Sequence, residues 1–169
     1  HSKKLFKTLK KSRLPVIYTR EPGGTKSGET IRKNILDSKK NYFNKYTELF
    51  LYFASRNELI HKVLIPSFKK KKIIICDRFT DSTYAYQVCG FGVKKLLVNI
   101  VHKVILNNIK PDLTFVLKVN VNTALKRVTK RGKKNRYDKF SRIFYSKIQN
   151  AFLKIANRNR TKYLIMILR

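Results

Sequence analysis

The residues best suited to chemistry are the few acidic side chains of a strongly basic chain. The 169 residues include 40 Lys and Arg but only 9 Asp and Glu. Asp77 and Arg78 directly follow an apolar run at 73–76, and Asp81 comes shortly afterwards, in the stretch CDRFTDSTYAYQ. A carboxylate at the end of a buried strand is suited to organise a cation. The alternative is an ordinary ion pair between Asp77 and its neighbour Arg78.

A second candidate segment reads TREPGG, residues 19–24, and carries Glu21. The Gly pair that follows Pro22 predicts a turn, because glycine tolerates a positive φ that other residues rarely adopt. Glu21 therefore lies just before a tight loop. The sequence alone does not fix the geometry of the peptide bond before Pro22.

The elements that must position these residues alternate between strand-like and helical patterns. Short runs that are apolar and rich in β-branched or aromatic residues predict buried strands at 15–18, 73–76, 113–119 and 163–168. Helical patterns lie at 2–12, 27–37, 47–64, 93–106, 122–130 and 139–158, and Asn120 or Asn122 is the expected N-cap of the fifth. This alternation predicts an α/β fold with a parallel sheet flanked by helices. No repeat or linker interrupts it, so one domain over 1–169 is expected.

In such sheets ligands bind beyond the C-terminal ends of the strands. The first predicted strand runs into the TREPGG loop and the second into Asp77 and Arg78. The third is followed by a helix that leads to Arg131 and Gly132. These strand ends are therefore the expected site.

Composition and charge limit the classes of protein. An apolar fraction of 43% is typical of a globular chain, and no apolar run is long enough for a membrane helix. Cys76 and Cys89 do not form a metal-like pair, and a reducing, cytoplasmic compartment is expected. The net charge of +31 suits a phosphate-bearing ligand. The lysines are spread along the chain, so nucleic acid is not an expected partner.

Four segments, in this order, resemble the bacterial thymidylate kinase family: TREPGGTKSGETIRK, YFASRNELI, CDRFTDSTYAYQ and PDLTFVLKVNVNTALKRV. Together they cover nearly the whole chain, and their order and spacing make the resemblance specific. It implies a three-layer P-loop kinase-like fold and transfer of the ATP γ-phosphoryl group to dTMP, with Mg²⁺ as cofactor.

The resemblance also implies an acceptor pocket. Its residues hold the phosphate (Arg32, Arg78), the thymine carbonyl (Arg56), the base edge (Gln87), the base plane (Tyr52) and further parts of the nucleotide (Ser82, Tyr86). The family usually has Phe where this chain has Tyr52, and a tyrosine ring can still stack on a base. For Tyr52 and Tyr86, ordinary core packing is the alternative.

For the donor side, the resemblance places Asp77 and Glu21 near Mg²⁺ and the phosphates. It indicates a lid at about 130–138, with Arg131 and Arg136 as candidate catalytic residues and Arg127 and Arg131 as candidate ATP ligands. Lys133 and Lys134 also lie in this stretch, where a solvated basic loop is the alternative.

The sequence departs from the family in one respect. The pattern G-x-x-x-x-G-K-[ST] does not occur in the 169 residues. The expectation is that the first strand and the P-loop precede His1 and that the terminal helix is missing, so that this chain alone has little or no activity. Two alternatives stay open: a non-catalytic remnant of a kinase, and a kinase for another deoxynucleoside monophosphate. By resemblance a homodimer is expected, with the helix at 47–64 as the main contributor.

Overall fold

A computed structural model describes residues 1–37, 43–130 and 135–168. The chain divides into two compact units: residues 1–35 with 46–80, and residues 36–45 with 81–169. Each unit is described by itself. The expected single domain over 1–169 stays a prediction.

The first unit is built on two parallel strands, β1 (Val16–Arg20) and β2 (Ile73–Asp77), paired from Val16 opposite Ile73 to Arg20 opposite Asp77. Helix α1 (Ser2–Lys11) packs against both strands, and the rings of Phe6 and Tyr18 lie 6.0 Å apart. The strands follow the predicted apolar runs closely, because β-branched side chains favour the extended backbone.

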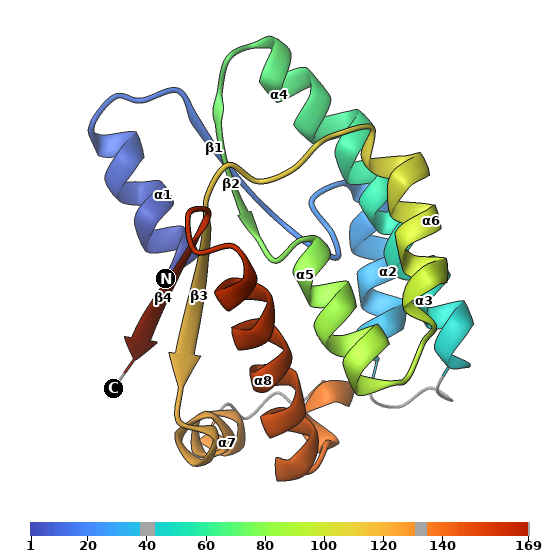
Figure 1. The fold of residues 1–169 in the computed structure, drawn as a ribbon. Helices are drawn as coiled ribbons and strands as arrows, with labels where there is room; N and C mark the ends of the chain where they lie inside the picture. Colours follow the sequence, from blue (N-terminus) through green and yellow to red (C-terminus); the bar gives the residue numbers. More distant parts are fainter. Residues whose placement is uncertain (38–42, 131–134, 169) are drawn as a thin grey trace. The chain divides into compact units, whose positions relative to one another are not determined.

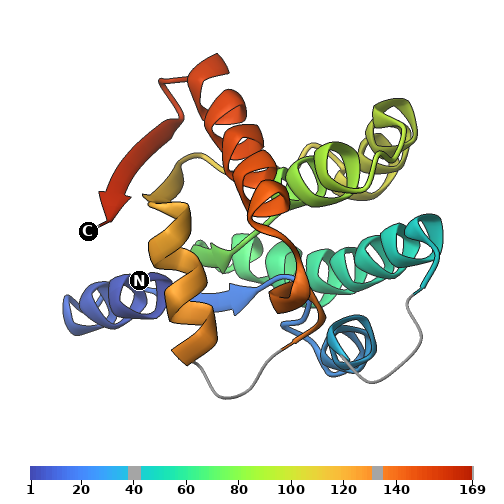
Figure 2. The ribbon, with the colours of Figure 1, turned by 90° about the horizontal axis from the view of Figure 1, so that it is seen from below.

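Between the two strands the chain forms α2 (Lys26–Leu36), α3 (Lys45–Leu59), a π-helical stretch (Ile60–Leu64) and α4 (Ile65–Lys69). Helix α2 lies next to α3 in both views (Figures 1 and 2). The buried apolar side chains of this unit come mainly from these helices: Ile35, Leu49, Phe53, Leu59, Ile60 and Leu64. The predicted helix at 47–64 is therefore confirmed, and helical structure continues to Lys69 because Pro66 falls in the first turn of α4, where its missing N–H costs nothing.

The second unit contains α5 (Thr80–Thr83), a π-helical stretch (Tyr84–Gly90), α6 (Lys95–Leu106), β3 (Thr114–Val119), α7 (Val121–Lys130), a 3₁₀ turn (Arg136–Lys139), α8 (Arg142–Arg158) and β4 (Tyr163–Leu168). Strands β3 and β4 pair in parallel from Thr114 opposite Tyr163 to Val119 opposite Leu168. Helix α8 packs against both strands and against the π-helical stretch, and α7 lies beside α8 (Figures 1 and 2). Ala85, Ile148 and Ala151 form the buried centre.

Two helices of the second unit begin at a short polar side chain that caps them. Asn120 Oδ1 accepts a hydrogen bond from the Asn122 backbone N–H at 2.9 Å, which confirms Asn120 as the cap of α7. Ser141 Oγ accepts one from the Phe144 N–H at 3.3 Å at the start of α8. In the part of the chain that is described, no helix is long and apolar enough to cross a membrane.

The pair β3 and β4 leaves many apolar side chains exposed. Phe115 is 43% exposed, Ile165 40% and Ile167 74%. The parallel strands of α/β proteins are usually covered on both faces. This strand pair therefore presents an exposed apolar surface on the second unit.

Candidate active site

The C-terminal ends of β1 and β2 lie at the same edge of the first unit. Arg20 is opposite Asp77, and the Glu21 backbone N–H donates to the Asp77 carbonyl oxygen at 3.0 Å. Glu21, Asp77 and Arg78 therefore meet at one edge, where ligands of parallel sheets bind. The sequence predicted that the ends of these two strands lie at one site.

The loop after β1 makes an abrupt turn. The Glu21–Pro22 peptide bond is cis, and Gly23 and Gly24 have φ values of 126° and 82°. At Gly24 a Cβ atom would overlap Thr19 Oγ1 and the Leu59 side chain, so the loop needs glycine there for space as well as for its backbone conformation.

Arg56 and Glu21 form a buried ion pair beside this loop. Arg56 Nε lies 2.5 Å from Glu21 Oε1, and the two side chains are 1% and 2% exposed. The guanidinium also lies over the rings of Phe53 and Phe79, at 5.8 and 5.5 Å from their centroids. Burial raises the pKa of Glu21 above its ordinary value, although the charge and the hydrogen bond of Arg56 act in the opposite direction.

A second Arg–Glu pair lies on the other side of the loop and is half-exposed. Arg20 Nε and Nη2 donate to the two carboxylate oxygens of Glu29, at 3.2 and 2.7 Å. The hydrogen bond from Arg20 is the main reason why the pKa of Glu29 lies below its usual value. Neither Arg20 nor Glu29 was a candidate from the sequence. The available signal was an acidic residue in the first turn of the helix that follows a Gly-Gly loop.

Several arginines gather around this second pair. Arg32 Nη1 donates to the Pro22 carbonyl oxygen at 2.9 Å. The pKa of Arg32 is lowered first by burial and then by the positive charge of Arg20, with Arg78 acting in the same direction. Arg78 is exposed and has a φ of 69°, a left-handed conformation that is uncommon for a residue with a side chain. These arginines make an electropositive patch suited to an anion.

The two acidic candidates for a metal site differ in accessibility. Asp77 is exposed and accepts hydrogen bonds from Ser2 Oγ and Tyr18 Oη at 3.3 and 3.4 Å. Glu21 is held by Arg56 in the interior. The described residues contain no cluster of three or more His, Cys, Asp or Glu side chains that could hold a metal. Mg²⁺ at phosphates is commonly held by one or two carboxylates plus water, so a lone exposed Asp77 fits this ion.

Tyr52 and Cys76 are two further, partly buried side chains of the first unit. Tyr52 lies on α3 and is half-buried. Burial raises the pKa of the Cys76 thiol, which makes it a poor nucleophile.

The other acceptor candidates lie in the second unit. Gln87 is 2% exposed, and Tyr86 packs edge-to-face against Tyr137 at 5.4 Å within a group of aromatic rings. Ser82 is half-buried on α5. The convergence of Gln87, Ser82 and Tyr86 with the arginines of the first unit stays a prediction.

The lid candidates are only partly described. Arg136 is 7% exposed in the 3₁₀ turn, with its guanidinium 5.6 Å from the Tyr137 ring centre, and Arg127 is exposed on α7. Arg131, Lys133 and Lys134 lie outside the described residues.

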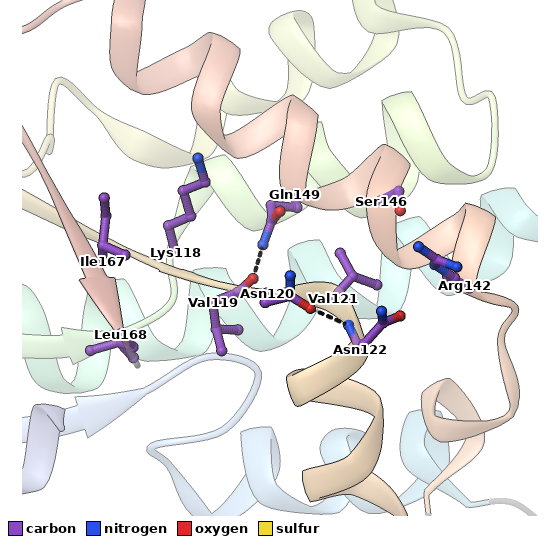
Figure 3. A pocket seen from close by; sticks show the side chains of 10 residues that line it. All are labelled: Lys118, Val119, Asn120, Val121, Asn122, Arg142, Ser146, Gln149, Ile167 and Leu168. Atoms are coloured by element: carbon purple, nitrogen blue, oxygen red, sulfur yellow. Dashed lines mark hydrogen bonds between the residues drawn. The ribbon is translucent and has the colours of Figure 1, made fainter.

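A cavity of about 370 Å³ opens at the C-terminal ends of β3 and β4. Figure 3 shows Lys118 and Arg142 at different places on its rim, and Gln149 from α8, which donates to the Val119 carbonyl oxygen at 2.5 Å. None of its residues was predicted from the sequence to bind a ligand, although the rule that ligands bind at strand ends pointed to this edge.

Comparison with known proteins decides the family. A family model described as thymidylate kinase matches residues 1–167. The chain belongs to the thymidylate kinase family. The sequence-based recognition of this family is confirmed.

Thymidylate kinases of several bacteria are similar in sequence. The enzyme named thymidylate kinase from Pseudomonas fluorescens is 36% identical over 160 residues, which cover 95% of this chain and 76% of that protein. Those from Chlamydia felis and Mycoplasma capricolum are each 39% identical, over 89% and 92% of this chain and 74% of either relative.

The fold agrees with this family. The crystal structure of thymidylate kinase from Ehrlichia chaffeensis matches with a TM-score of 0.78 and 29% identity, covering 99% of this chain and 80% of that one. The predicted α/β class, with parallel strands flanked by helices in a P-loop kinase fold, is confirmed.

Proposed function

We propose that this protein is a dTMP kinase that transfers the γ-phosphoryl group of ATP to dTMP. The bond between the γ-phosphorus and the β,γ-bridging oxygen breaks, a bond from that phosphorus to a 5′-phosphate oxygen of dTMP forms, and the products are ADP and dTDP. Membership of the thymidylate kinase family is the observation that carries this proposal.

The arginine patch supplies what an acceptor phosphate needs. Arg32 and Arg78 are the proposed ligands of the dTMP phosphate, because guanidinium groups can donate paired hydrogen bonds to phosphate oxygens. Only part of the Arg32 guanidinium is used by Pro22, through Nη1. The left-handed backbone of Arg78 supports a functional role, since such strain tends to persist at binding sites.

The base is proposed to be recognised by Tyr52, Arg56 and Gln87. Tyr52 would stack on thymine, and Arg56 would donate to a thymine carbonyl. Since Arg56 Nε is engaged with Glu21, the proposed donor is one of its terminal nitrogens. Ser82 and Tyr86 are proposed to complete the pocket beside the sugar.

Asp77 is the residue proposed to hold Mg²⁺, directly or through water, with Glu21 close by. The ion would neutralise charge on the phosphates of the donor. On the donor side Arg127, Arg131 and Arg136 are proposed to contact ATP, the last two as lid residues.

A titration of nucleotides tests the acceptor assignment. We expect dTMP to bind about tenfold or more tightly than dCMP, because the proposed acceptor for Arg56 is the carbonyl at position 4 of thymine, and cytosine carries an amino group there. Formation of dTDP from ATP and dTMP with Mg²⁺, measured on the full protein, tests the reaction. If dTMP binds no better than dCMP or dGMP, the base assignment is wrong and a kinase for another deoxynucleotide is favoured. Tight dTMP binding without dTDP formation would favour the non-catalytic remnant.

We also propose a homodimer formed by helices. On α6, Leu96, Ile100 and Val104 follow one another at intervals of four residues and are 69%, 54% and 75% exposed, so they form one apolar stripe. On α3, Phe50 is 52% exposed. Helix α6 therefore offers an apolar stripe to a partner, and α3 offers one exposed aromatic ring.

Sedimentation equilibrium tests the dimer. We expect the dimer to strengthen with salt, because each chain carries a net charge of +31. Ile100→Glu should weaken association, whereas Lys103→Glu on the same helix should not. A monomer at micromolar concentration in high salt would contradict the proposal.

A further inference from the structure

Side chains from two helices help to hold the loop after β1. Three of its polar backbone groups bond to these side chains: the Pro22 carbonyl oxygen accepts from Arg32 Nη1 at 2.9 Å, and the Gly23 N–H donates to Ser55 Oγ at 3.0 Å. The Gly24 N–H donates to Glu29 Oε1, also at 3.0 Å. Residues of α2 and α3 therefore determine where the loop lies.

Glu29 connects strand β1, the loop and helix α2. Its carboxylate accepts from the loop at Gly24 and from both Nε and Nη2 of Arg20, the last residue of β1. Glu29 itself lies in the first turn of α2, three residues before Arg32, so the two side chains share one face of the helix. One carboxylate thus ties the strand, the loop and the helix together.

The fit around this carboxylate is close. A Cβ atom at Gly23 would overlap Glu29 Oε1, so the loop runs directly against the carboxylate. The carboxylate also provides the negative charge in the arginine patch. Repulsion from Arg20 and Arg78 acts on Arg32, whereas Glu29 attracts it.

We infer that Glu29 is a positioning residue for the acceptor phosphate. By fixing Arg20 and the loop, it sets the position of the Pro22 carbonyl oxygen, and this oxygen in turn orients the Arg32 guanidinium toward the phosphate. The inference rests on the proposed function, in which Arg32 binds the phosphate of dTMP. Glu29 itself does not contact the nucleotide.

Paired titrations with dTMP and thymidine test this role, because the nucleoside lacks the phosphate. Glu29→Gln keeps the size of the side chain but loses its charge and one bond to Arg20. We expect its Kd for dTMP to rise about tenfold while its Kd for thymidine stays within about twofold, since one charged contact is affected. Glu58→Gln is the matched control: Glu58 also pairs with a cation, Lys62, and it accepts from Ser27 Oγ rather than from the loop backbone. It should leave both Kd values unchanged.

A double variant tests whether Glu29 acts through Arg32. On the Arg32→Ala background, Glu29→Gln should cause no further loss of dTMP affinity. If Glu29→Gln weakens dTMP and thymidine equally, or weakens neither, or adds fully to Arg32→Ala, the inference is wrong.

Two further measurements distinguish failure of this inference from unfolding of the variant and from failure of the proposed function. Should Glu29→Gln unfold, Arg20→Gln removes the same ion pair from the other side, and it should show the same selective loss for dTMP. Wild-type protein that binds neither dTMP nor thymidine would instead contradict the proposed function.

Discussion

Two pairs of the same chemical type flank one loop and behave in opposite ways. The Arg56–Glu21 pair is almost fully buried, whereas the side chains of Arg20 and Glu29 are 43% and 41% exposed. The pKa of Glu21 is raised by burial, and that of Glu29 is lowered by its hydrogen bond from Arg20. The degree of burial, rather than the identity of the partner, therefore decides the direction of the shift.

The difference indicates two separate roles. A buried charge without its partner is strongly destabilising, so Arg56 and Glu21 depend on each other for the stability of the first unit. A half-exposed pair contributes little to stability because water screens it. The Arg20–Glu29 pair can therefore take part in ligand binding without being needed for stability.

The largest effect is expected for Arg56→Met. This change leaves the Glu21 carboxylate buried without a counter-charge, and we expect the free energy of unfolding to fall by about 3–5 kcal/mol. Urea unfolding without nucleotide measures it. Arg20→Met is the matched control and should cost less than about 1 kcal/mol. Equal losses in the two variants would remove the distinction between the pairs.

An intermediate effect is expected for Arg78→Ala. Binding of dTMP should weaken by about 1.5–3 kcal/mol, the usual range for a hydrogen bond to a charged group, with little change in stability. Calorimetric titration with dTMP measures this. Arg13→Ala is the control, because Arg13 is also exposed and also has a left-handed backbone, with a φ of 57°. Unchanged binding in Arg78→Ala would exclude its proposed role.

The smallest effect is the pH dependence of the exposed pair. Because the folded-state pKa of Glu29 is below its usual 4.5, its contribution to stability is present above that value and is lost as the pH falls through the folded-state pKa. The difference in unfolding free energy between wild type and Glu29→Gln should thus shrink in acid. Its plateau at neutral pH should be below about 1 kcal/mol.

For Glu21 we expect the opposite dependence of stability on pH. Its folded-state pKa is raised, so its ionisation opposes folding as the pH rises above 4.5 and through the folded-state value. Unfolding of wild type and Glu21→Gln across the same pH range measures this trend. If the difference in unfolding free energy between wild type and Glu21→Gln changed with pH in the same direction as that for Glu29→Gln, the two carboxylates would share one environment.

The sequence predicted the strands well because their apolar runs are continuous and short. The bounds 163–168 of β4 are as predicted, and β2 differs only by including Asp77. It did not predict the helical segments at 80–90, where polar, aromatic and small residues alternate without a clear period. The π-helical part of this stretch is stabilised by packing against α8, an element far along the chain.

Within the site, strand ends were predictable and side-chain partners were not. The positions of Asp77 and Arg78 follow directly from the end of an apolar run. The pairing of Glu21 with Arg56 joins residues that are far apart in sequence, and it depends on how α3 packs at the strand edge. The role of Glu29 depends on the path of a loop with two glycines of positive φ, which allows many backbone paths and leaves the choice to tertiary contacts.

The exposed apolar faces of β3 and β4 have a practical consequence for handling the protein. At low ionic strength the mutual repulsion of chains with a net charge of +31 keeps these faces apart. At about 0.15 M salt the repulsion is screened over about 8 Å, so it opposes contact between Phe115 and Ile167 of neighbouring molecules much less. Self-association of purified protein should therefore increase as salt is added, and a buffer of low ionic strength is the better storage condition.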